Sequence, residues 1–185
     1  MSSTAHSLEL ANTVLGSGPA RVDVLQTPAD LVRWLEGVEP VIGPAPVETG
    51  LRLADFRSLR EAIRSLFQAV AVGHPVAPEA VESVNAASAA ESSYPSLDAS
   101  DPRLPVAVEV PSAGSRTAEI LALISRSAIG LVGGPDRERL RACGGSGCGR
   151  FFLASRPRQV WCSPACGNRA RVARHHARRR AASST

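Results

Sequence analysis

Four cysteines in the last third of the chain are the residues whose type and spacing most clearly predict chemistry. Cys143 and Cys148 form one close pair, and Cys162 and Cys166 form a second. Two short Cys-to-Cys steps separated by a longer loop are typical of a tetrahedral Zn²⁺ site, because each step is a tight turn that directs two thiolates toward one point. The glycines between Cys143 and Cys148 permit such a turn. We therefore expect one structural Zn²⁺ bound by all four cysteines.

Two other uses of these cysteines must be weighed, namely two disulfides or unrelated thiols in a core. The N-terminus has neither the basic start nor the apolar run of a secretory signal, and no stretch reaches the roughly 18 apolar residues of a membrane span. We therefore expect a cytoplasmic protein with no membrane partner. In that reducing compartment, cysteines stay available to a metal.

A catalytic zinc would keep one coordination position open and would use histidine or carboxylate ligands more often than four thiolates. His175 and His176 are alternative ligands, which the complete set of cysteines makes the weaker choice. His6 and His74 are isolated, with no carboxylate or serine partner visible in the sequence. We therefore expect a closed structural site and no enzyme.

The charge of the chain is divided along its length. All basic residues other than histidine are arginine, and from Arg137 onward 12 arginines face one acid, which is a net charge of +11. The preceding part carries −7, and the whole chain +4. A basic segment joined to an acidic body is typical of a protein that binds a polyanion such as nucleic acid. The alternative is a solvated charged tail with no partner.

The elements that must position these residues can be predicted from periodicity and from Gly and Pro signals. A strand is expected over 106–110, with a partner around 94–97. In the helix over 51–72 we place Arg60 on the polar side, away from the apolar stripe. The fold class is α+β: a mostly helical N-terminal domain, residues 1–134, with a short β element, followed by a zinc finger, residues 135–185. Helices are expected over 8–15, 27–37, 51–72, 78–91, 115–131 and 136–142.

Within the finger, Phe151 to Leu153 form a short apolar strand, and we expect the returning strand of a β-hairpin at 159–161. Ser163 and Pro164 then predict a helix start, with serine as the N-cap and proline in the first turn. A turn, a hairpin and a basic helix with two ligands at its start make a treble-clef-like finger.

The tetrapeptide Cys166-Gly167-Asn168-Arg169 and its flanking sequences, CGRFFLAS and VWCSPACGNRARVARHHARRR, resemble the CGNR zinc-finger family. Three earlier pieces, LELANTV, DVLQTPADLVRWL and FRSLREAIRSLF, resemble the alanine-rich ABATE domain that precedes that finger. The chain departs from the finger pattern at Ala154, where the family usually has Asp, and in a shortened turn at 156–158. The resemblance implies a stress-responsive transcription regulator, a role inferred for the family largely from its finger.

On a helix of about 100° per residue, Arg169 lies beside the small-residue face that carries Cys166. We expect Arg169, helped by Asn168, to support the zinc thiolates by hydrogen bonding. Arg171, Arg174 and Arg178 share the opposite face and should point outward to phosphates. The side chains expected to bind nucleic acid are Arg156, Arg158, Arg171, Arg174, Arg178, Arg179 and Arg180.

The leading functional hypothesis is a DNA-binding transcription regulator, partnered by duplex DNA on the nucleoid, whose N-terminal domain senses a signal or mediates dimerisation. One alternative is an RNA- or ribosome-associated zinc protein, because the same basic helix fits RNA. A second is a protein-interaction module with a solubilising tail. An enzymatic N-terminal domain has no supporting motif. The sequence leaves open the DNA target, any small-molecule ligand and the oligomeric state, a homodimer included.

Overall fold

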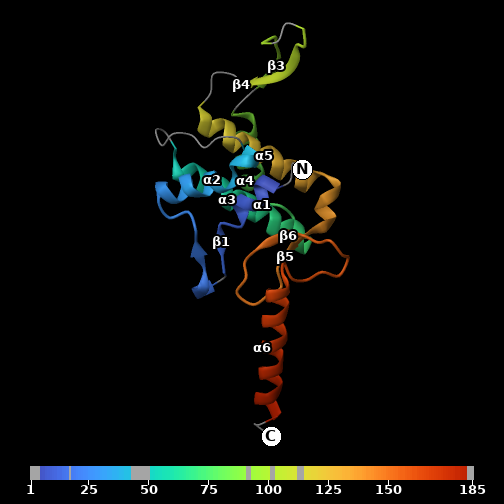
Figure 1. Ribbon diagram of the computed structural model, residues 1–185. Coiled ribbons are helices and arrows are strands. Elements are labelled where there is room, and N and C mark those ends of the chain that lie inside the picture. The colour runs from blue at the N-terminus through green and yellow to red at the C-terminus, as the bar shows by residue number, and fades with distance from the viewer. Residues whose placement is uncertain are drawn as a thin grey trace.

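A computed structural model describes residues 5–16, 18–42, 51–90, 93–100, 103–111 and 115–182. These residues form a body of five helices, with a hairpin at one end and a long sixth helix extending from the other (Figure 1). The described helices are α1 (Ala5–Ala11), α2 (Pro28–Ile42), α3 (Leu53–Val72), α4 (Pro78–Ala89), α5 (Arg116–Gly133) and α6 (Pro164–Ala182).

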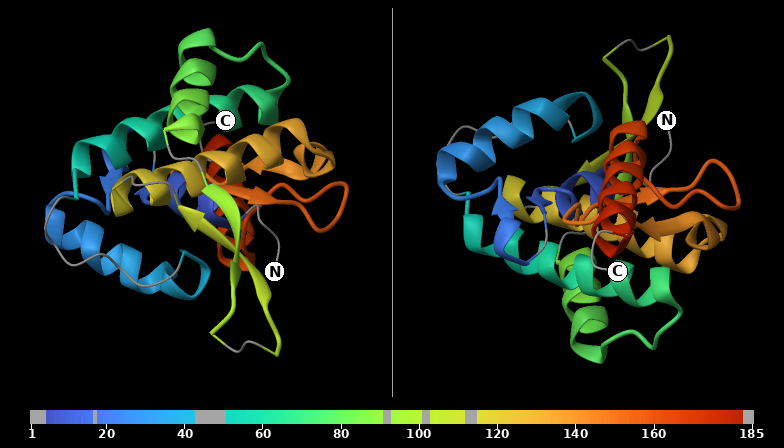
Figure 2. Two further views of the ribbon diagram at one scale, coloured as in Figure 1. Left: turned by 90° about the horizontal axis from the view of Figure 1, so that it is seen from above. Right: turned by 90° about the horizontal axis from the view of Figure 1, so that it is seen from below.

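The described strands form antiparallel pairs, which confirms the α+β class. β1 (Val14–Leu15) pairs with β2 (Val22–Asp23), β3 (Ser93–Asp98) with β4 (Val106–Pro111), and β5 (Leu140–Ala142) with β6 (Phe151–Leu153). The β3–β4 pair, with Leu97 opposite Ala107, matches the expected strand and partner. This hairpin projects beyond the helices in both views of Figure 2.

The core lies between α3 and α5, and α1, α2 and α4 close around it. In α3 the apolar residues recur at helical spacing, so Phe56, Ile63 and Phe67 all point inward and are fully buried. The helix ends at Gly73, whose positive φ of 73° lets the backbone turn and close the last carbonyls of α3. In α5, the Ser115 side chain caps the first turn by accepting a hydrogen bond from the amide of Ala118.

The core does not stop at residue 134. Leu140 of β5 is fully buried, and Phe151 of β6 is buried against α3, with its ring 5.6 Å from that of Phe67 in an edge-to-face arrangement. Both belong to the same cluster of buried side chains as Phe56 and Ile124. The small sheet of the finger is therefore packed into the body, which fixes where the cysteine loops emerge.

The expected hairpin of the finger was wrong in its second strand. β6 pairs with β5, which precedes the first cysteine pair, and 159–161 forms no strand. β5 begins where a helix over 136–142 was expected, and only a short 3₁₀ helix, Pro135–Arg139, comes before it. The physical reason is burial: pairing Leu140 with Leu153 lets both strands pack their apolar side chains on the body.

Two other boundaries differ from expectation. α2 continues past Gly37 to Ile42, because a glycine within a helix lowers its stability without having to end it, and Val38 beyond it packs against the core. The first helix ends at Ala11, and Val14 and Leu15 form a strand instead of its last turn.

Arg60 was expected on the polar face of α3, but its side chain is only 2 % exposed. It forms a bidentate ion pair with Asp23, with both N–O distances 2.6 Å, and donates a 3.2 Å hydrogen bond to the hydroxyl of Thr13. Burial opposes ionisation of Asp23, but the hydrogen bond and charge of Arg60 lower the pKa of Asp23 below its ordinary value of 3.8. The pair thereby fixes the segment between α1 and β2. Within the described ranges, none of the helices combines the length and apolarity needed to cross a bilayer.

Replacing Asp23 with Ala should lower the free energy of unfolding by about 3 kcal/mol, because the buried Arg60 guanidinium loses its bidentate partner. Urea denaturation measures this, and Glu36→Ala at an exposed position of α2 should change it by less than about 0.5 kcal/mol. The Asp23 contribution is present above the unfolded-state pKa and is lost as pH falls through the lowered folded-state pKa. Equal effects of the two substitutions would contradict this role.

Candidate metal centre and basic helix

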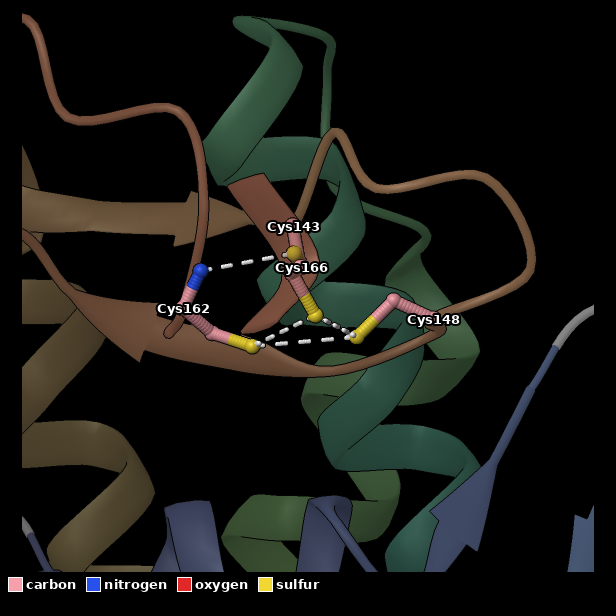
Figure 3. A group of neighbouring side chains, drawn as sticks. All are labelled: Cys143, Cys148, Cys162 and Cys166. Carbon is pink, nitrogen blue, oxygen red and sulfur yellow. Dashed lines mark hydrogen bonds between the residues drawn. The ribbon is translucent and has the colours of Figure 1, made fainter. Parts of the chain in front are cut away.

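The four cysteines converge from two loops and the start of α6 (Figure 3). All four Sγ atoms lie within 4.8 Å of one another, and the three distances among Cys148, Cys162 and Cys166 are 3.6 to 3.7 Å. A tetrahedral zinc with Zn–S bonds of about 2.3 Å requires S···S separations of about 3.8 Å. The donor set therefore fits one structural Zn²⁺, with four thiolates and no open coordination position.

The cysteines of this cluster differ in how readily their thiols ionise. Burial raises the pKa of Cys148, and burial with hydrogen bonds to the neighbouring cysteines raises the pKa of Cys162 to about 12. A hydrogen bond from Ser163 lowers the pKa of Cys166 to about 7. The raised pKa values of Cys148 and Cys162 mean that burial opposes their ionisation, and a bound Zn²⁺ reverses this by stabilising the thiolates directly.

The first cysteine loop, between β5 and β6, is closed by its own backbone and by the N-terminal body. The amide of Cys143 donates to the carbonyl of Arg150 at 2.8 Å, and the amide of Gly16 donates to the carbonyl of Cys148 at 2.9 Å. Gly149 has φ of 67°, and a Cβ there would lie 2.2 Å from the carbonyl oxygen of Gly16. Only glycine permits this close approach between the loop and the segment after α1.

Asn12 binds the outer edge of β6 as a further strand would. Its side-chain amide donates to the carbonyl of Phe151 at 3.0 Å and accepts from the amide of Phe151 at 2.9 Å. Arg64 of α3 donates to the carbonyls of Ala11 and Gly149, and its guanidinium lies 5.2 Å from the centroid of the Phe151 ring. The body thus holds the first cysteine loop on both sides.

Arg169 and Asn168, which were expected to support the zinc site, have different environments. Arg169 donates a 3.0 Å hydrogen bond from Nη2 to the Sγ of Cys166. One Zn²⁺ and four thiolates have a net charge of −2, and Arg169 places its positive charge against one of these thiolates. Asn168 is exposed, and its side chain makes no hydrogen bond within the part of the chain that the structure describes.

A scan of protein families gives two matches that divide the chain near the start of the finger. Residues 5–135 match the family model ABATE, described as "Putative stress-induced transcription regulator". The chain belongs to the ABATE family. Residues 139–179 match the CGNR zinc finger, so the metal centre built by the four cysteines is the centre of that finger. No curated protein matches the chain.

The second loop of the CGNR finger, 155–161, is held against the start of α6. The Gln159 side chain accepts hydrogen bonds from the amide and hydroxyl of Ser155 at 2.9 and 3.0 Å and donates to the carbonyl of Trp161 at 3.1 Å. A Cβ on Gly167 would lie 3.2 Å from the Trp161 indole, so glycine allows the ring to approach the helix. Arg174 lies over the same ring, 5.9 Å from its centroid.

The arginines expected to bind nucleic acid fall into two groups. Arg156, Arg158 and Arg171 line one groove between this loop and α6. Arg174, Arg178 and Arg179 lie further along α6 and are exposed, and the side chain of Arg180 lies outside the described residues. Arg171 and Arg174 are thus on the Trp161 side of the helix. His175 and His176 are exposed on α6, apart from the cysteine cluster.

Sequence reasoning missed the supporting residues Asn12, Arg64 and Gln159. Asn12 lies in LELANTV, one of the pieces that resembled the ABATE domain, but no local pattern assigned it a role at a cysteine loop 139 residues away from it along the chain. Arg64 lies by helical periodicity on the side of α3 away from the apolar stripe, a position that gives no sign of a contact with the finger. The contacts of Asn12 and Arg64 with the finger are long-range, so periodicity and local spacing carried no signal for them. Gln159 bonds within its own loop, to Ser155 and Trp161, in a stretch that was expected to be a strand.

Replacing Arg169 with Ala should speed zinc loss to a chelator about tenfold, because the contact with Cys166 is removed. Release of Zn²⁺ followed with a colorimetric chelator measures this, and Arg178→Ala, which removes the same charge from an exposed position on α6, is the matched control. If both variants release zinc at the wild-type rate while nucleic-acid binding of Arg169→Ala collapses, Arg169 belongs to the binding surface instead.

Proposed function

We propose that this ABATE-family protein is a transcription regulator that binds duplex DNA through α6 of its CGNR finger. The observation that carries the proposal is the position of α6. Its first turn holds Cys166 in the zinc site, and the rest of the helix extends away from the body (Figure 1). Residues 171–179 are exposed, so the helix offers its surface to a partner.

The arginines of this region differ from those of the body in their pairing. Several arginines of the body form ion pairs, for example Arg21 with Glu61 and Arg33 with Asp30. Arg156, Arg171 and Arg178 form no ion pair within the described ranges of the chain. Guanidinium groups without carboxylate partners are available to phosphates, which they bind in a bidentate manner.

The length and pattern of α6 fit a duplex. The helix has 19 residues, a length of about 28 Å. The major groove of B-DNA admits an α-helix, and arginine is the residue that most often contacts guanine there. Arg171, Arg174 and Arg178 follow one another at i, i+3 and i+7, which places them on one side of the helix.

We also propose roles for the ABATE region and for the protein as a whole. The ABATE region receives a signal or joins two copies of the chain, and the protein acts in the cytoplasm on the nucleoid. We propose no catalytic step at the metal, because the metal-binding cluster found among the described residues has four thiolate ligands and leaves no position for a substrate.

Replacing both Arg171 and Arg174 with Ala should make the negative slope of log K against log salt shallower by roughly two units for duplex DNA. Each lost phosphate contact reduces the magnitude of that slope by about 0.9. Fluorescence anisotropy across a salt series measures the slope, with zinc content as the check on folding. Arg33→Ala with Arg52→Ala is the control, because it makes the same change in net charge on the exposed surface of the body.

Equal slopes for the two double variants would show that binding follows overall charge and not α6. Tighter binding of an RNA competitor than of the duplex would favour the RNA-associated alternative. Absence of binding to any duplex at low salt would favour a protein-interaction module.

A further inference from the structure

The groove between loop 155–161 and α6 has a volume of about 530 Å³ and two kinds of wall. The apolar surface comes from Val160, Trp161 and Pro164. The Val160 side chain is apolar, yet the residue is 49 % exposed. Arg156, Arg158 and Arg171 supply positive charge, and none of the described residues that line the groove carries a carboxylate. The volume lies in the range of sites for small organic ligands and exceeds what a phosphate group alone requires.

The walls of this groove are held in place. Gln159 closes the loop through its bonds to Ser155 and Trp161, and the amide of Gly144 donates to the carbonyl of Val160 at 2.9 Å. The second contact ties the apolar wall to the first cysteine loop of the zinc site. The groove is therefore formed before any ligand arrives, which lowers the entropy cost of binding.

The combination of surfaces identifies the chemistry of the occupant. An aromatic ring with adjacent apolar surface stacks a nucleobase, and arginines beside it bind the attached phosphate. Arg158 and Arg171 form no ion pair in the described part of the chain, so the groove keeps its positive charge. An acidic peptide would satisfy the arginines, but it would leave the Trp161 and Val160 surface without a planar partner.

We propose that this groove binds one nucleotide that is unstacked from its strand, with its base against Trp161 and Val160 and its phosphate among Arg156, Arg158 and Arg171. The inference rests on the proposed binding of nucleic acid by α6 and adds a preference to it. Extruding a paired base costs a few kcal/mol, and least where the base is already unpaired. The protein should therefore favour a duplex with an unpaired nucleotide over the same duplex fully paired.

The test uses two short duplexes that differ only in one unpaired thymidine, and the full-length zinc-loaded chain. Anisotropy should give about tenfold tighter binding to the bulged duplex, as expected for one stacked base. In the Trp34→Phe variant, Trp161 is the remaining tryptophan, and its fluorescence should be quenched by the bulged duplex and much less by the paired one.

Val160→Asp places a carboxylate in the groove and should abolish the preference for the bulge, with zinc content unchanged. Val76→Asp, a partly exposed valine of the body, should keep it. Equal affinity for the two duplexes and unchanged Trp161 fluorescence would overturn the nucleotide site but leave DNA binding by α6 in place. Binding of neither duplex would overturn both proposals. Because the anisotropy comparison uses wild-type protein, it does not depend on how Trp34→Phe folds.

Discussion

The convergence of four thiolates on one metal ion is the constraint on which the rest of the finger depends. The ligands come from the loop between β5 and β6, from the end of loop 155–161 and from the first turn of α6. The body holds the first cysteine loop, but loop 155–161 and α6 bury few of their described side chains, so the metal fixes these two segments to that loop. With that point in place, α6 leaves the body in one direction, and its arginines extend from a defined base.

A second set of contacts sets the position of the metal centre relative to the ABATE region. The side chain of Asn12 completes the edge of β6, and Gly16 bonds the carbonyl of a zinc ligand, Cys148. Arg60, which is paired with Asp23, also donates a hydrogen bond to Thr13 and so holds the segment that contains Asn12 and Gly16. A change in the body that moves this segment therefore acts directly on the first cysteine loop, which gives the N-terminal region a physical route to the finger.

The sequence was most informative where short-range pattern decides structure. The four ligands, α3, α5 and the β3–β4 hairpin were predictable from spacing, from apolar periodicity and from alternation. The strand that pairs with β6 was not predictable, because the segments before and after it are about equally near in sequence. Burial of Leu140 in the body favours β5 as the partner. The burial of Arg60 was not predictable either, because a helical pattern marks an arginine as polar. That pattern cannot reveal an ion-pair partner, Asp23, that lies 37 positions earlier.

Amide hydrogen exchange of the full chain, with zinc bound and after its removal by a chelator, tests most directly whether the metal centre and the body are one structural unit. The amide of Gly16 reports on its bond to the Cys148 carbonyl, and the amide of Cys143 reports on the loop itself. The account predicts that removal of zinc exposes both amides together, while those within α3 stay protected. Loss of protection at Cys143 with no change at Gly16 would contradict it.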